Sequence, residues 1–334
     1  MAMLFSILIF LLCTAVIVFS GTRLSRYGDK IAELTGMGRA WTGLILMASV
    51  TSLPELITGI SSVTIVGAPD LAAGDIFGSC VFNLLILSVL DWQLGKPLFS
   101  YVRTGHLVAA VYGIILFSIA AMGIFLSYRG ISLLWVSGFS LLLVMVYLIA
   151  IRSVYLYEQR DHIPEAAETA GEPADRQSLR KAIKGYSIHA VVVIAAALFL
   201  PFAGEQIAAA SGLGNSFFGT LFLAASTSLP ELVVSLAALR IGAVDMAVGN
   251  LLGSNVFNMF ILALDDIFYT KTSLFSAITP THLVSVLVMI VMSAVVMLGL
   301  LFKPRRKAFL KFGADTLVLV VLYLLLMSYL FIKK

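Results

Sequence analysis

Charged residues are scarce in this sequence of 334 residues. Asp, Glu, Lys and Arg together make up 12% of it, whereas a soluble globular domain carries roughly 25%. Hydrophobic residues make up 60%, so the chain has too little polar surface to face water on all sides. The shortage of charge excludes an ordinary soluble protein and predicts a protein whose main solvent is lipid.

Cysteine and histidine are rare as well. The two cysteines, Cys13 and Cys80, both lie inside apolar runs, which argues against a framework of exposed disulfides and predicts buried free thiols. The four histidines and two cysteines form no cluster of the kind that binds zinc. We expect no bound cofactor and no nucleic-acid partner.

Long apolar runs are abundant. A helix needs about 20 mainly apolar residues to cross a bilayer. Ten stretches meet this length: residues 3–21, 38–63, 71–92, 105–127, 131–151, 186–210, 214–239, 244–268, 280–302 and 313–332. The sequence therefore predicts an all-α membrane protein with ten transmembrane helices. The first run has neither a basic segment before it nor an A-x-A cleavage site after it, so we interpret it as a span and not as a signal peptide.

Basic residues fall almost entirely on one side of these spans. The odd-numbered connections hold 18 of the 22 lysines and arginines, and the other side holds Arg129, Lys271, Lys333 and Lys334. Because cytoplasmic loops carry the excess of basic residues, this pattern predicts a multi-pass protein of the cell (cytoplasmic) membrane with both termini outside. The polar connection 153–184 predicts a flexible cytoplasmic linker between two halves, residues 1–152 and 185–334.

The two halves resemble each other. ASVTSLPEL at 48–56 matches AASTSLPEL at 224–232, and DLAAGDIFGSCVFNLLIL at 70–87 matches DMAVGNLLGSNVFNMFIL at 245–262. Each half holds five predicted spans, an odd number, so the second half enters the membrane with the opposite orientation. Inverted repeats of this kind are typical of secondary transporters, whose substrate site lies near the midplane between the halves.

One acidic residue in each half lies deep inside a predicted span. Glu55 and Glu231 each follow the proline of a TSLPE motif. An ionisable side chain at that depth is costly and indicates function more strongly than a hydrogen bond between two protonated acids. Proline removes a backbone donor, so carbonyls near Thr51 and Thr227 lose their helical partners and become available to a hard cation.

The second repeated motif adds oxygen ligands and small residues. Ser79 and Asn83 are four residues apart and share one helix face, as do Ser254 and Asn258. With the glutamates and threonines they make an oxygen-rich cage, and Ca²⁺ takes about six to eight oxygen ligands. The asparagines could instead join helices, and the serines could bond back to their own helix. Glycines four residues apart in the same motif predict a close approach of helix backbones.

These motifs resemble the α-repeats of the Ca²⁺/cation antiporter superfamily, its sodium/calcium exchanger branch in particular. The TSLPE and GSxVFN segments recur in order in both halves. The resemblance implies a central Ca²⁺ site made of matching residues from the two halves: Glu55, Glu231, Asn83, Asn258 and the carbonyls of Thr51 and Thr227. It also implies two Na⁺ sites, each made of an alanine, a threonine and a serine: Ala48, Thr51 and Ser79 on one side, and Ala224, Thr227 and Ser254 on the other.

The implied function is a secondary antiporter that exchanges Ca²⁺ for Na⁺ by alternating access. We expect spans one and six to slide past the core and a single chain to suffice. The sequence also admits proton-coupled Ca²⁺ exchange, or another divalent ion such as Mg²⁺ or Mn²⁺. An intramembrane aspartyl protease is disfavoured because Asp75 has Asn250 at its repeat position, so we expect no enzyme; broken helices in inverted repeats disfavour a channel.

The remaining intramembrane aspartates suggest structural roles. Asp70 and Asp245 open two matching spans and are expected to be helix N-caps. Asp91 and Asp266 end the same spans, where we expect structural pairing. Asp75 could be a further carboxylate beside the ions or could face a polar partner in the bundle.

Overall fold

The computed structural model describes residues 2–35, 48–126, 132–161, 176–308 and 311–333, and most of them are helical. In lipid a helix is favoured because it satisfies its own backbone hydrogen bonds. Among the described residues, eight helices are long and apolar enough to cross a membrane: α1 (Ala2–Thr35), α5 (Pro69–Gln93), α6 (His106–Phe125), α7 (Gly138–Asp161), α8 (Arg176–Ser211), α12 (Val244–Phe268), α14 (His282–Phe302) and α15 (Ala314–Ile332).

Two further segments are broken. In the second half, α9 (Asn215–Phe218), η4 (Gly219–Leu223) and α10 (Ala224–Thr227) meet α11 (Leu229–Arg240) at a bend of 44°, which makes a ninth candidate span. The matching segment of the first half comprises α3 (Ala48–Thr51), α4 (Leu53–Ser61) and η2 (Ser62–Val66), and the predicted start of that span, 38–47, lies outside the described residues. The all-helical membrane fold is thus confirmed.

Several helices extend beyond the predicted spans. α1 continues to Thr35, α7 continues to Asp161, and α8 already begins at Arg176. Both ends of the predicted linker 153–184 are therefore helical, and its middle, 162–175, lies outside the described residues. Hydropathy marks where a span leaves the lipid, whereas Lys, Arg, Glu and Gln are good helix formers and continue the helix beyond that point.

Short elements connect some of the helices. They are the 3₁₀-helix η3 (Leu98–Ser100), the helix α13 (Leu274–Ala277) and a hairpin of β1 (Ser132–Leu133) and β2 (Val136–Ser137). The hairpin takes the start of the predicted span 131–151, so α7 begins at Gly138.

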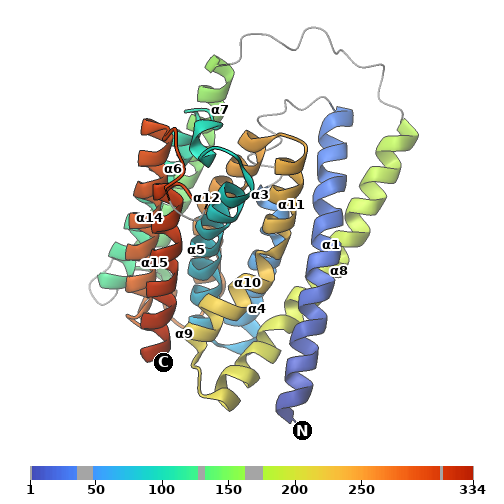
Figure 1. Cartoon of the computed structure of the whole chain (residues 1–334). Helices are drawn as coiled ribbons and strands as arrows, with labels where there is room; N and C mark the ends of the chain where they lie inside the picture. Colours follow the sequence, from blue (N-terminus) through green and yellow to red (C-terminus); the bar gives the residue numbers. More distant parts are fainter. Residues whose placement is uncertain (1, 36–47, 127–131, 162–175, 309–310, 334) are drawn as a thin grey trace.

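Figure 1 shows how the helices are grouped. α1 and α8 lie side by side at one edge, α6, α7, α14 and α15 lie at the other, and α5 and α12 stand between them with the broken segments. α1 starts and α15 ends at the same end of the molecule. In the most apolar 18 residues of α5 and of α12, 83% of the window is buried, against 22% in α1. The centre of the bundle is therefore made of the two helices that carry the second repeated motif.

Glycines bring α5 against η4 at backbone distance. A Cβ on Gly74 would lie 3.0 Å from the Gly219 Cα, and a Cβ on Gly78 would lie 2.7 Å from the Thr220 Cα. Larger side chains would hold the two backbones apart. The close approach predicted from the glycine spacing is confirmed for this pair of elements.

Asp91 ties the end of α5 to the loop before α15. Its buried carboxylate accepts hydrogen bonds from the Leu98 N (2.6 Å), the Gly313 N (2.7 Å) and the Thr316 Oγ1 (2.7 Å), and it pairs with the Lys307 Nζ at 2.8 Å. Asp266 does the same for α12, since it accepts from backbone amides at both of its oxygens. The structural pairing expected for these two aspartates is confirmed.

Replacement of Asp91 tests this role. Asp91→Ala removes the side-chain acceptor of two backbone amides and the anion that pairs with Lys307, so it should destabilise the fold by roughly 3–5 kcal/mol, the cost of breaking a buried pair. The measurement is the thermal unfolding temperature in detergent. Lys307→Met keeps the carboxylate with its amide donors and should lower that temperature less; an equal or larger loss for Lys307→Met would contradict the assignment.

Asp70 and Asp245 are not N-caps, contrary to the prediction. Each lies inside the first turn of its helix, and no side-chain cap bond is present at either helix start. Asp70 Oδ1 instead lies 3.1 Å from the His282 Nε2, and Asp245 Oδ1 lies 3.2 Å from the His106 Nε2. Each aspartate thus ties its helix to the other half, where a backbone amide also donates to it: Thr279 N to Asp70 and Arg103 N to Asp245, each at 2.7 Å.

Candidate ion-binding site

Both broken segments break at a serine. Ser52 separates α3 from α4 with φ −85° and ψ 13°, and Ser228 separates α10 from α11 with φ −90° and ψ 4°. A proline follows in the first turn of α4 and of α11, where its missing N–H costs no hydrogen bond and the helix can restart. The TSLPE motif therefore makes the same break twice and sets a glutamate in the first turn after it.

Glu55 is fully buried and contacts the other half of the chain. Its Oε1 accepts hydrogen bonds from the Ser228 Oγ (2.9 Å) and from the Ser79 Oγ (3.4 Å). Glu231 is the mirror image: it is fully buried and its Oε1 accepts from the Ser52 Oγ at 3.2 Å. Each breaking serine thus reaches the glutamate of the opposite half.

A hydroxyl cluster surrounds Thr227 at the end of α10. The Thr227 Oγ1 donates to Asp75 Oδ1 at 2.9 Å and lies 3.4 Å from the Ser79 Oγ. It also approaches the carbonyl of Ala224, 3.2 Å away. Asp75 therefore faces a polar partner in the bundle, and this partner belongs to the predicted ion site.

The matching cluster surrounds Thr51 at the end of α3. The Thr51 Oγ1 lies 3.4 Å from the Ser254 Oγ and 3.5 Å from the Asn250 Oδ1. Ala48 begins α3 three residues earlier, and its side chain lies outside the described residues.

The structure groups the hydroxyls differently from the prediction. Ser79 meets Thr227 and Ser254 meets Thr51, whereas the two predicted Na⁺ sets kept each threonine with the serine of its own half. The reason is the interlocking of the halves: α10 packs on α5, and α3 packs on α12. Each cluster is therefore built from both repeats.

The two central asparagines differ in their contacts. The Asn83 Nδ2 donates to the Asn255 Oδ1 at 3.1 Å, and the Asn255 Nδ2 donates to the carbonyl of Cys80 at 3.2 Å, so Asn83 joins α5 to α12. Asn258 is fully buried, and neither of its side-chain polar atoms has a hydrogen-bond partner among the described residues.

The centre of the bundle therefore holds unpaired oxygens from both halves. In the part of the chain that the structure describes, five buried side-chain oxygens of this cluster lack a hydrogen-bond partner: Glu55 Oε2, Glu231 Oε2, Asp75 Oδ2, Asn83 Oδ1 and Asn258 Oδ1. An unsatisfied buried acceptor costs about 1–3 kcal/mol, and more when it is charged. A cation bound among these oxygens would remove that cost, and a mixture of carboxylate, amide and hydroxyl oxygens suits a hard cation.

Comparison with known proteins identifies the family. The family model described as sodium/calcium exchanger protein matches residues 5–154 and 185–332. The chain belongs to the sodium/calcium exchanger family. Family membership confirms the predicted exchange of Ca²⁺ for Na⁺ and does not favour the proton-coupled alternative. The family comprises transporters.

Individual relatives and a solved structure are similar to this chain. An uncharacterised membrane protein of Methanocaldococcus jannaschii is 30% identical over 240 residues, which cover 68% of this exchanger and 70% of that protein. The sodium/calcium exchanger MaX1 of Methanosarcina acetivorans is 45% identical over 83 residues, 24% of this chain and 23% of that one. The solved structure of the sodium-calcium exchanger NCX_Mj matches with a TM-score of 0.65 over 97% of both chains at 22% identity, which shows a shared fold.

Two residues of the candidate site are not singled out by the sequence. Ser52 and Ser228 lie inside the TSLPE motif, and each reaches the opposite glutamate. The available signal was their identical position in both copies of TSLPE. The sequence alone could not show that each serine points across to the other half.

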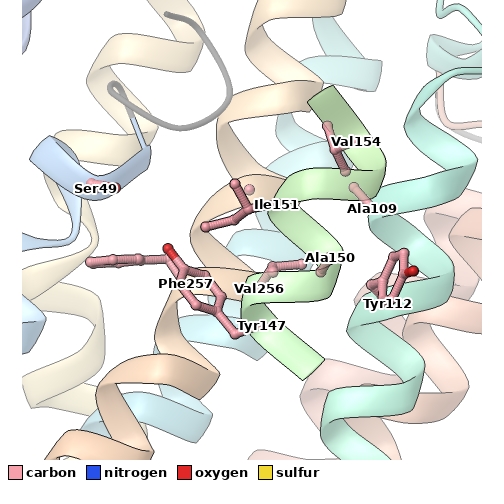
Figure 2. Close-up of a pocket in the computed structure, with 10 residues that line it drawn as sticks. Ser49, Ala109, Tyr112, Tyr147, Ala150, Ile151, Val154, Val256 and Phe257 are labelled. Carbon is pink, nitrogen blue, oxygen red and sulfur yellow. The ribbon is translucent and has the colours of Figure 1, made fainter. Parts of the chain in front are cut away.

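A pocket adjoins the site on one side (Figure 2). Ser49 of α3 and Gly253 and Phe257 of α12 line it, together with Tyr147 and Ile151 of α7. Ser49 and Gly253 are close in sequence to Thr51 and Ser254, so the pocket borders their cluster. Its lining is mainly apolar, so it offers few ligands to an ion.

Proposed function

We propose that this exchanger binds one Ca²⁺ between Glu55 and Glu231 and trades it for Na⁺ at the same oxygens. The observation that carries the proposal is the set of unpaired, buried oxygens that both halves direct into the centre. Two carboxylates balance the charge of one Ca²⁺, and the amide oxygens of Asn83 and Asn258 add neutral ligands. The carbonyls near the helix breaks at Thr51 and Thr227 raise the number of oxygens toward the six to eight, roughly, that Ca²⁺ takes.

The two hydroxyl clusters are the proposed Na⁺ sites. One combines Thr227, Ser79 and the carbonyl of Ala224, and it adjoins Glu55 through Ser79. The other combines Thr51 and Ser254 with the backbone of Ala48. Because Ser79 also donates to Glu55, Na⁺ bound there would compete with Ca²⁺ for that carboxylate. Competition for shared ligands is what couples the two ions.

The proposed architecture is two inverted repeats of five spans, residues 1–152 and 185–334, joined by a cytoplasmic connection. The repeated helix breaks, the matched roles of Asp91 and Asp266, and a family match in two segments support it. The excess of basic residues in the odd-numbered loops supports termini outside a cell membrane. Exposed leucines and phenylalanines on α1 and α15 suit contact with lipid, and one chain carries every proposed ligand.

Alternating access would use α1 and α8, which pack on each other at the edge of the bundle. Pro201 of α8 has no N–H for the carbonyl of Ala197, four residues earlier. Thr58 of α4 lies 3.5 Å from that carbonyl, and Ser61 donates to the carbonyl of Leu198 at 2.8 Å. Movement of the pair would exchange these contacts. A covalent cross-link between Phe10 of α1 and Phe218 of α9, whose rings lie 5.4 Å apart, made through cysteines, should stop transport; full transport after cross-linking would contradict this role.

The direct test uses purified exchanger in liposomes. Vesicles loaded with Na⁺ are diluted into Na⁺-free buffer with ⁴⁵Ca²⁺, and uptake is compared with vesicles that carry only a pH gradient. Uptake that requires internal Na⁺ supports the proposal. Uptake driven by the pH gradient alone, or by neither gradient, would overturn Na⁺ coupling in this chain.

Loss of the serine that reaches Glu55 from the opposite half should weaken Ca²⁺ binding. Ser228→Ala removes a hydroxyl that holds the Oε1 of Glu55 in place at 2.9 Å. The Ca²⁺ concentration that gives half-maximal exchange should therefore rise roughly tenfold, which corresponds to about 1.4 kcal/mol. Ser118→Ala is the matched control, because that hydroxyl bonds back to its own helix α6, outside the site. Equal Ca²⁺ dependence in the two variants would argue against Ser228 as a site residue.

A further inference from the structure

One buried carboxylate lies outside the site described above. Asp265 of α12 is fully buried, and neither of its oxygens has a hydrogen-bond partner among the described residues. A carboxylate in such a place is costly when ionised and uncompensated. A protonated carboxyl group would need an acceptor for its proton, and no described residue provides one. The geometry therefore suits a carboxylate that holds a cation.

A glycine of the other half makes room for the Asp265 side chain. Its carboxylate rests against Gly59 of α4, where even a methyl group would overlap both oxygens. Gly59 follows Glu55 by one helical turn, about 6 Å along the axis. Ser62, the next residue on that face, has a buried hydroxyl that also lacks a partner in the described chain. Glu55 and Gly59 of α4 and Ser62 at the start of η2 thus form a stripe that leads away from the central site.

This stripe leads toward one surface of the protein. α4 continues into η2 and ends at Gly67, where an added Cβ would lie 3.3 Å from the Lys271 Nζ. Asp265 lies one turn before the end of α12, which leads into the same loop. Asp265 is therefore placed between the central site and the end of the molecule that carries Lys271.

The other half has no such group. The residue that matches Asp265 in the first repeat is Leu90, and the residues that match Gly59 and Ser62 are Ser235 and Ala238. Ser235 turns inward to hydrogen-bond its own half, since it accepts from the Asn250 Nδ2 at 3.3 Å. The extra carboxylate therefore breaks the symmetry of the two halves and is present on one side of the central site only.

We propose that Asp265 binds a monovalent cation, Na⁺, on the route between the central site and the Lys271 end of the exchanger. A single carboxylate balances a single positive charge, and the buried hydroxyl of Ser62, three residues after Gly59, offers a neutral oxygen on the same route. The inference rests on the proposed Na⁺/Ca²⁺ exchange at Glu55 and Glu231. It adds a second site, which is passed only by ions that enter or leave through the Lys271 end.

The first test is chemical labelling without transport. Dicyclohexylcarbodiimide modifies buried carboxyl groups, and mass spectrometry of the purified exchanger reports the labelled fraction of Asp265. Na⁺ should reduce labelling of Asp265, and an equal concentration of a large organic cation such as N-methylglucamine should not. If Na⁺ does not change the labelled fraction of Asp265, or if Ca²⁺ lowers it and Na⁺ does not, the assignment is wrong.

The second test measures sidedness. In vesicles of known orientation, Asp265→Asn should raise the half-maximal Na⁺ concentration about tenfold at the Lys271 face and leave the opposite face unchanged. Gly59→Ala, which displaces the carboxylate, should shift the same face. Asp315→Asn is the control, since it alters another carboxyl group with an unpartnered oxygen, in the first turn of α15. If Asp265→Asn changes the half-maximal Na⁺ concentration equally at both faces, or at neither, the proposal is wrong. Intact Na⁺/Ca²⁺ exchange by the wild type in the same experiment would still support the proposed function.

Discussion

Glu55→Gln is expected to abolish Ca²⁺ uptake driven by a Na⁺ gradient. The amide keeps the volume of the side chain and can still accept from Ser228 and Ser79, but it removes one of the two charges that balance Ca²⁺. We expect Ca²⁺ affinity to fall by a factor of about 100 or more, which corresponds to roughly 2.8 kcal/mol. The measurement is ⁴⁵Ca²⁺ uptake into Na⁺-loaded liposomes, with Ca²⁺ binding to the purified protein as a second readout.

The matching substitution in the other half, Glu231→Gln, provides a second test of the same site. Glu231→Gln should be as severe as Glu55→Gln, because the two side chains have matched positions and each receives a serine from the other half. Glu205→Gln, which alters a partly exposed glutamate of α8, should retain uptake and so controls for expression and insertion. Ca²⁺ uptake near the wild-type rate in either central variant would remove these glutamates from the proposed site.

Gly78→Ala is expected to disrupt the centre of the fold. The new Cβ would lie 2.6 Å from the Ala224 Cβ and 2.7 Å from the Thr220 Cα, and it would meet the carbonyl oxygen of Thr220 more closely still. Two of these neighbours are backbone atoms of η4 that cannot rotate away, so η4 and the adjoining α10 must move off α5. Overpacking of this kind costs about 1–3 kcal/mol or more. Because Thr227 of α10 contacts Ser79 of α5, movement of α10 would disturb the proposed Na⁺ site. Transport should therefore fall together with the unfolding temperature.

A second helical glycine provides the control. A Cβ on Gly113 of α6 would meet only a Phe117 ring carbon at 3.9 Å, an ordinary contact. Gly113→Ala should therefore leave transport intact and could raise stability by about 0.5–1 kcal/mol, since alanine favours a helix interior more than glycine does. Similar unfolding temperatures for the two alanine variants in detergent would show that the contact of α5 with η4 and α10 is not tightly packed.

The sequence by itself determined the membrane class, the positions of most spans and the two glutamates of the candidate site. These features are local: hydropathy accumulates along a run of about 20 residues, and a repeated TSLPE motif is visible without knowing what it contacts. The same local evidence misplaced helix ends, as at Thr35 and Asp161, because a hydropathy run ends at the lipid boundary while the helix continues into the polar region.

Only the tertiary structure decided which residues meet. Ser52 reaches Glu231 and Ser79 meets Thr227 because each broken helix packs on the central helix of the opposite repeat. The partners lie well over a hundred residues apart, and no local pattern encodes that crossing. Asp265 shows the same limit, since its unpaired carboxylate and the glycine that accommodates it come from different halves. Most residues of the candidate site follow from the sequence, but their pairing follows from the way the two halves of the chain interlock.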